Sequence, residues 1–379
     1  MSNVFYTNNI ESNVLSKTID KLRFPLTVLV VVLHCSVRRK GMIVNEDLSD
    51  IFSILIAYSY NFIYALLNGA LAHLAVPTFF FISGYLFFMK GDFSISTYRN
   101  KLHKRIKTLF VPYVAWIALY VVSTIIYKVM EDPSFNIMTF FKDNGYLRLF
   151  YDCNVWHTQM SLLSGPFLIP LWYIRDLMVM VIISPLIYFL IKRTRHIYII
   201  CLTCLFLLRL WPDIHGISLT AIFFFSLGSE FSIRKRNFVV DMYKISNITN
   251  ILFAVLLAII LMQCLHIYIM DFSVFPLFLV VGVVFLFNLT SSYVRRNISK
   301  KNNLSKYSFF MYCAHHVLLI GLSIKIVDKF LIVVENETLK QLLALLITPI
   351  LLIFICIMLY KVIQRFIPSV LKILTGERS

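Results

Sequence analysis

Long apolar segments recur along the whole of this 379-residue chain. Hydrophobic residues make up 59% of it and charged residues only 15%, a balance that a water-soluble domain of this size does not normally show. Each segment has about 20 residues, enough to cross the roughly 30 Å hydrocarbon core of a bilayer as a helix. The sequence predicts an all-α, polytopic membrane helix bundle that forms one domain over residues 1–379.

Hydropathy predicts about ten transmembrane helices. They lie near residues 22–38, 71–90, 109–128, 170–191, 197–211, 217–233, 248–266, 272–290, 308–330 and 341–364. The apolar stretch 51–68 is either an extra span or an interfacial helix. Residues 1–21 and 365–379 are expected to be short tails, and Pro25 fits the first turn of the first helix.

The distribution of charge predicts the orientation, because Lys and Arg in short loops mark the cytoplasmic side. With the N-terminus inside, most of the 36 basic residues fall in inner segments and most acidic residues in outer ones. We therefore expect both termini to be cytoplasmic. The net charge of +17 then reflects orientation and contact with anionic lipids rather than binding of nucleic acid.

Cysteine usage points to no special chemistry. Six of the seven cysteines lie in or at the ends of apolar segments, where cysteine behaves as a small hydrophobe. Neither a disulfide framework nor a metal site is expected.

Two polar residues of the first span are the first candidates for chemistry. Arg23 and His34 are eleven positions apart, so a helix would place them on one face, roughly 16 Å apart. His34 could act as a general base, and Arg23 at the inner rim could bind phosphate. The alternative is a structural histidine bonded to a carbonyl, with an arginine that merely obeys the charge rule.

Further polar residues stand in or beside apolar segments. Ser83-Gly84 suggests close helix packing. Arg175 and Asp176 indicate either the wall of a polar cavity or a structural ion pair. Tyr312 and His315 lie one helical turn apart. Lys101, Lys104 and Arg105 would form one basic face of a helix.

Several ordered motifs resemble the acyltransferase-3 family of bacterial membrane acyltransferases, whose members commonly O-acetylate cell-surface polysaccharides. These motifs are the Arg23/His34 spacing, Val76–Tyr85, Lys101–Arg105 before Pro112-Tyr113, Leu171–Leu177, Phe225–Gly228 and Ser308–His315. Together they extend over roughly residues 22–316.

The resemblance implies a function and a set of roles. His34 would be catalytic with Arg23 assisting, and acetyl-CoA would be the acyl donor, bound through its phosphates by Lys101, Lys104 and Arg105. The acceptor would be a hydroxyl of a surface glycan or its lipid-linked precursor, and no cofactor would be bound. The residues implied for the acceptor site or active-site wall are Ser83, Trp172, Arg175, Asp176, Tyr312 and His315. The location implied is the bacterial inner membrane.

The chain departs from the better-known polysaccharide modifiers of that family. We expect no appended extracytoplasmic domain, and Leu171-Trp-Tyr-Ile-Arg-Asp176 replaces a tryptophan-serine-leucine-glutamate stretch. It looks more like the stand-alone branch, some of whose members are proposed to act in export. A polysaccharide polymerase or flippase is therefore the main rival function, and a small-molecule transporter is a weaker one.

Overall fold

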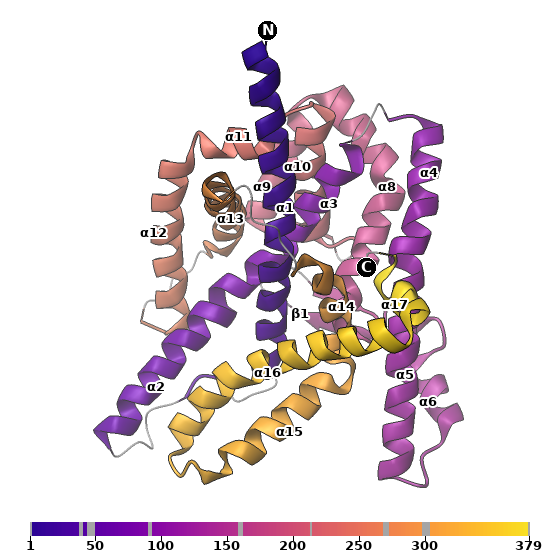
Figure 1. The fold of residues 1–379 in the computed structure, drawn as a ribbon, viewed down its shortest axis with the longest axis vertical. Helices are drawn as coiled ribbons and strands as arrows, with labels where there is room; N and C mark the ends of the chain where they lie inside the picture. Colours follow the sequence, from indigo (N-terminus) through magenta and orange to yellow (C-terminus); the bar gives the residue numbers. More distant parts are fainter. Residues whose placement is uncertain are drawn as a thin grey trace. The chain divides into compact units, whose positions relative to one another are not determined.

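A computed structural model describes residues 2–37, 41–43, 50–89, 93–157, 162–212, 214–267, 273–297 and 304–377 (Figure 1). The described chain is helical apart from a short antiparallel hairpin of β1 (Asn154–His157) and β2 (Leu162–Gly165), in which Asn154 pairs with Gly165. The all-α membrane fold is confirmed. The helices pack into two compact units that interleave along the sequence.

Unit 1 comprises Met1–Thr78, Asn237–His315 and Leu319–Met358. Its elements are α1 (Ser2–Val37), α2 (Ile51–Tyr64), the π-helix η2 (Ala65–Ala70), the 3₁₀-helix η3 (Leu71–Leu74), α11 (Phe238–Tyr243), α12 (Ser246–Cys264), α13 (Phe275–Arg296), α14 (Ser305–Ala314), α15 (Ile320–Phe330), the 3₁₀-helix η7 (Leu331–Val333) and most of α16 (Glu337–Phe366). Helix α1 packs against α13 and α14, and α12 packs along α13.

Unit 2 comprises Phe79–Arg236, His316–Leu318 and Leu359–Ser379. Besides the hairpin it contains most of α3 (Ala75–Phe88), α4 (Ile95–Arg105), the π-helix η4 (Ile106–Phe110), α5 (Val111–Glu131), α6 (Ile137–Asn144), α7 (Arg148–Tyr151), the 3₁₀-helix η5 (Ile169–Leu171), α8 (Trp172–Thr194), α9 (Ile197–Leu208), α10 (Leu219–Ile233) and α17 (Pro368–Thr375). Stacked phenylalanines join α9 to α10, with the ring centroids of Phe206 and Phe223 4.5 Å apart.

Six helical runs of the described chain are long and apolar enough to cross a membrane. They are Ile51–Phe88, Ile95–Glu131, Ile169–Thr194, Ser246–Cys264, Phe275–Arg296 and Glu337–Phe366. The shorter apolar helices α9 and α10 match two more of the predicted spans. The stretch 51–68 forms the first part of the continuous helical run Ile51–Phe88. The remaining two predicted spans, 22–38 and 308–330, differ from the prediction.

The first predicted span belongs to a longer helix. Helix α1 begins at Ser2, so the prediction that Pro25 lies in a first turn was wrong. Hydropathy missed the early turns because they are amphipathic: Val14, Thr18 and Leu22 recur at helical spacing and are buried, while intervening positions are polar. Near its start, Glu11 accepts two hydrogen bonds from Arg295 at 2.6 and 2.7 Å.

The predicted span 308–330 is broken. Helices α14 and α15 are separated by the π-helix η6 (His315–Leu319), and the backbone inside it is non-helical at Val317 and Leu318. Leu318 has a φ of 60°. A π turn in a helix often marks a functional position, and this one begins at a predicted site residue, His315.

Short polar side chains begin several of these helices. The hydroxyl of Ser218 accepts a hydrogen bond from the Ala221 N–H at the start of α10, and Asp50 and Asn136 do the same at the starts of α2 and α6. Such caps satisfy N–H groups that have no partner within the helix. They define where the chain leaves a loop and enters each of these helices.

Glycines bring α3 and α10 into backbone contact. A Cβ atom on Gly84 would lie 2.0 Å from the carbonyl oxygen of Phe225, and one on Gly228 would lie 2.0 Å from that of Phe81. The two contacts are reciprocal, so each helix approaches the other at its own glycine. This confirms that Ser83-Gly84 marks a close helix crossing.

Candidate functional site

Arg23 and His34 lie on the uninterrupted helix α1. Eleven residues of helix separate their Cα atoms by roughly 16 Å. Arg23 is exposed, and its Nη1 lies 3.7 Å from Oδ1 of Asp20. The Thr27 hydroxyl bonds to the Arg23 carbonyl at 2.9 Å. The two predicted residues therefore occupy the same element, as their spacing requires.

His34 lies beside a second histidine in unit 1. The centroid of its ring is 5.2 Å from that of His315, and the planes are inclined by 39°. His315 is fully buried, and His34 is partly buried. The ring of Tyr312, one turn earlier on α14, lies 6.4 Å from that of His315. Helices α1 and α14 thus bring three of the predicted site residues together.

The tautomer of His315 follows from its backbone partner. Its Nδ1 lies 3.2 Å from the carbonyl oxygen of Met311, which can only accept, so Nδ1 carries the proton. In the neutral imidazole Nε2 is then a hydrogen-bond acceptor. A histidine held in this way can orient a neighbouring donor group or share a proton with it.

The structure adds a buried polar pair that sequence reasoning missed. The hydroxyl of Ser36 on α1 bonds to Oδ1 of Asn68, which lies in the π-helix η2 and is 6% exposed. Asn68 Nδ2 has no hydrogen-bond partner within the described chain. The available signal was an asparagine inside an otherwise apolar stretch, where an amide is costly unless it is used.

The predicted donor-binding cations lie on α4 in unit 2. Lys101, Lys104 and Arg105 share the last two turns of this helix. The ammonium of Lys101 donates to the Phe87 carbonyl at 2.5 Å and lies 5.2 Å from the centroid of the Phe87 ring. Lys101 therefore also ties α4 to the end of α3, whereas Lys104 is exposed.

Arg175 and Asp176 form a buried ion pair at the start of α8, 3% and 0% exposed. The guanidinium reaches Asp176 Oδ1 at 2.7 and 3.0 Å. It also donates to the Tyr151 carbonyl at 2.7 Å and to the Ser164 hydroxyl at 2.9 Å. Asp176 Oδ2 accepts the N–H of Ser218 at the start of α10. These bonds join α7, β2, α8 and α10, the arrangement expected of the structural alternative.

Ser83 and Trp172 both lie beside aromatic residues of unit 2. Ser83 Oγ lies 3.2 Å from the hydroxyl of Tyr173. The centroid of the Trp172 ring lies 6.3 Å from that of Phe80. Of the predicted residues, Arg23, His34, Tyr312 and His315 thus belong to unit 1, and the others belong to unit 2.

Comparison with known proteins agrees with the pattern of motifs. A family model described as an acyltransferase domain matches residues 17–361. The chain belongs to the acyltransferase-3 family. It is also similar to the succinoglycan biosynthesis protein ExoH of Rhizobium meliloti (strain 1021), with 24% identity over 83% of this chain and 81% of that protein. No solved structure matches it. The chain is therefore a multi-pass membrane acyltransferase.

Proposed function

We propose that this acyltransferase is an O-acetyltransferase of the bacterial inner membrane. It would move an acetyl group from cytoplasmic acetyl-CoA to a hydroxyl of a surface polysaccharide or its lipid-linked precursor. Membership of the acyltransferase-3 family supports acyl transfer. The similarity to ExoH, a succinoglycan biosynthesis protein, supports a glycan acceptor. The observation that carries the proposal is the histidine pair, with the ring of the partly buried His34 5.2 Å from that of the buried His315.

In the proposed reaction His34 acts as general base. Its neutral imidazole takes the proton of the sugar hydroxyl while the hydroxyl oxygen attacks the thioester carbonyl carbon. A tetrahedral intermediate forms and collapses as the C–S bond breaks. Coenzyme A leaves as a thiol after His34 returns the proton to sulfur. A route in which His34 first accepts the acetyl group also balances, but it needs one more covalent step.

The neighbours of His34 have proposed roles that follow from their contacts. His315, fixed through Nδ1 by the Met311 carbonyl, would orient His34 and stabilise its protonated form. We propose Tyr312 as a hydrogen-bond donor to the oxyanion, because its ring lies 6.4 Å from that of His315, the neighbour of His34. Arg175 is a poorer candidate, since its guanidinium donates to Tyr151, Ser164 and Asp176.

Phosphate recognition would rest on cations. Arg23 lies on the same helix as His34, roughly 16 Å from it, so it could bind phosphate while the flexible pantetheine arm carries the thioester inward. Lys104 and Arg105 on α4 would add charge, and Lys101 would do so only if its ammonium left the Phe87 carbonyl.

The test is the acetyl content of the glycan. The wild type is produced in a host that bears the candidate polysaccharide but lacks its O-acetylation, and base-labile acetate esters on the purified glycan are measured by NMR. Esters that appear only with the protein support the proposal. Normal protein levels in the membrane without any ester, together with altered glycan export, would contradict it and favour the export function.

A further inference from the structure

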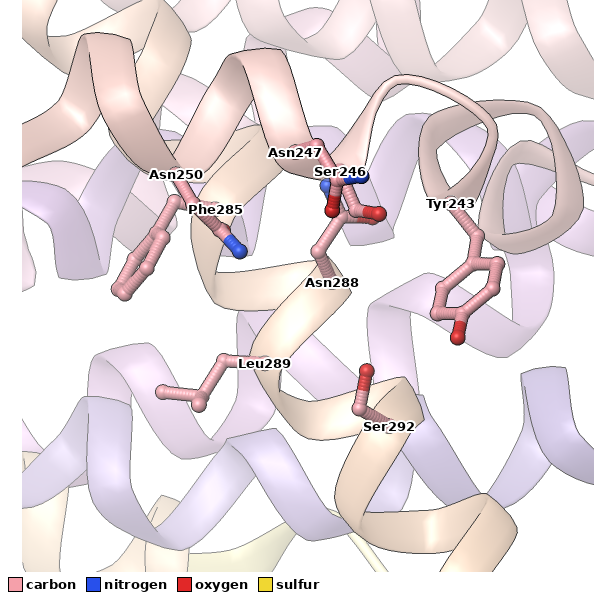
Figure 2. A pocket seen from close by; sticks show the side chains of 8 residues that line it. All are labelled: Tyr243, Ser246, Asn247, Asn250, Phe285, Asn288, Leu289 and Ser292. Carbon is pink, nitrogen blue, oxygen red and sulfur yellow. The ribbon is translucent and has the colours of Figure 1, made fainter.

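A polar cavity of about 240 Å³ lies between α12 and α13 in unit 1, and neither His34 nor His315 lines it (Figure 2). Its polar lining consists of Tyr243, Ser246, Asn247, Asn250, Asn288 and Ser292. The lining contains amides and hydroxyls but no carboxylate. Such a cavity suits a neutral or anionic ligand that both accepts and donates hydrogen bonds.

Asn288 is the strongest sign of a missing partner. It is 2% exposed, and neither its Nδ2 nor its Oδ1 has a hydrogen-bond partner in the described chain. Figure 2 shows its amide directed toward the start of α12, where Ser246 and Asn247 lie. Leaving a buried amide unsatisfied costs about 1–3 kcal/mol, so a bound group that satisfies both atoms is strongly favoured.

The first turn of α12 adds donors to the same cavity. This 19-residue helix begins at Ser246, and its N-cap residue Ile245 supplies no side-chain hydrogen bond. The N–H groups of an uncapped first turn, with the positive end of the helix dipole, attract the oxygens of a phosphate. Asn288 Nδ2 and the first turn of α12 therefore provide hydrogen-bond donors for a phosphate. Asn288 Oδ1 remains as an acceptor for a hydroxyl of the ligand.

The cavity lies toward the ends of two candidate membrane spans and is open at the surface of the unit. It is at the beginning of the candidate span α12 and within three turns of the end of the candidate span α13, which finishes at Arg295-Arg296. Only 22% of the apolar window of α12 is buried, and Asn247 and Asn250 are exposed. Basic residues flank both helix ends, the pattern predicted for the cytoplasmic side.

We propose that this cavity binds the glycerophosphate head group of a membrane phospholipid from the leaflet next to these basic residues. The phosphate oxygens accept hydrogen bonds from the first turn of α12 and from Asn288 Nδ2. A glycerol hydroxyl donates to Asn288 Oδ1. At the rim, the Tyr243 ring is held by the guanidinium of Arg295, which lies 5.1 Å from its centroid and is ion-paired with Glu11. This lipid site is separate from acyl transfer and does not depend on it.

The test uses the purified, delipidated full-length chain in detergent. The probes are dioleoyl phosphatidylglycerol, dioleoylglycerol, which lacks the phosphate, and glycerol 1-phosphate, which lacks the chains. Binding is measured by native mass spectrometry and by the rise in Tm. Asn288→Leu and Ser292→Ala alter the cavity. Ser59→Ala on α2 is the matched control, because its hydroxyl is exposed and bonds only within its helix, to Leu55.

The expected result is selective. Phosphatidylglycerol binds the wild type and the control Ser59→Ala with the same affinity. Asn288→Leu raises the Kd about tenfold or more, because two hydrogen bonds are lost. Ser292→Ala gives a smaller rise in Kd. Without lipid, Asn288→Leu is at least as stable as the wild type, since it removes an unsatisfied buried amide. Unchanged affinity in both cavity variants, or equal binding of dioleoylglycerol, would overturn the proposal. If glycerol 1-phosphate raised the Tm as much as the lipid does, the cavity would still bind a glycerophosphate group, but its ligand would be a soluble molecule and the lipid assignment would be wrong.

Discussion

His34 and His315 come from segments nearly three hundred residues apart in sequence, yet their rings are neighbours in one unit. A lone imidazole in an apolar helix bundle is more often structural, and His315 does make a structural bond to the Met311 carbonyl. A second imidazole beside it changes the chemistry, because protonation of one ring can then be shared or opposed by the other. This pairing is the feature that the spacing of Arg23 and His34 alone could not supply.

Arg175 and Asp176 give a test that separates a structural role from an active-site role. Arg175→Met leaves the buried Asp176 carboxylate unpaired, which should cost about 3–5 kcal/mol of stability. The double variant Arg175→Met/Asp176→Leu removes both charges and should be clearly less damaging. Thermal unfolding in detergent measures both variants. If the single variant kept the wild-type Tm while losing acyl transfer, the pair would be part of the active site instead.

The crossing of α3 and α10 depends on two glycines. Gly228→Ala would place a methyl group 2.0 Å from the Phe81 carbonyl oxygen, so the helices must separate. We expect a loss of roughly 1–3 kcal/mol or more, seen as a fall in Tm. Gly321→Ala on α15 is the matched control, since nothing lies within 4 Å of its added atom. A Tm for Gly228→Ala equal to that of the control would contradict the crossing.

The start of α2 should respond to acid through its cap. Hydrogen bonds from the Ser53 hydroxyl and then the Ser53 N–H hold the pKa of Asp50 below its ordinary value of 3.8. A carboxylate whose pKa is lower in the folded than in the unfolded state stabilises the folded state at pH values above its unfolded-state pKa. That contribution is lost as the pH falls through the folded-state pKa. The difference in Tm between the wild type and Asp50→Ala should therefore be present at neutral pH, shrink once the pH falls below 3.8 and vanish below the lowered pKa of the folded state. A difference independent of pH would contradict this account.

Element boundaries show where sequence reasoning works and where it fails. Uniformly apolar spans such as α5, α8, α12, α13 and α16 were predicted nearly in place, because burial in lipid leaves only a continuous helix. The amphipathic beginning of α1 was missed since its polar face lowers the mean hydropathy. The break at His315–Leu319 was also missed: π turns depend on tertiary packing and leave no periodic signal.

For the molecule as a whole, composition and motif order were sufficient to predict a multi-pass membrane protein and its family. The candidate site was predictable only in part. Helical spacing placed Arg23 and His34 on one element, whereas the contact with His315 and the Ser36–Asn68 bond join segments that sequence alone does not bring together. The glycan, its hydroxyl and the acyl group leave no pattern in a single sequence, so the acetyl group stays a proposal.

The central claim is that His34 carries the transfer, and labelled acetyl-CoA tests it most directly. Membrane vesicles with equal amounts of wild type, His34→Ala or His266→Asn receive the donor and the acceptor glycan, and acetyl groups on the glycan are counted. His266 is an exposed histidine after α12 and is the matched control. We predict that His34→Ala lowers the rate about a hundredfold or more, as loss of a general base does, while His266→Asn keeps the wild-type rate. Wild-type transfer by His34→Ala would contradict the account.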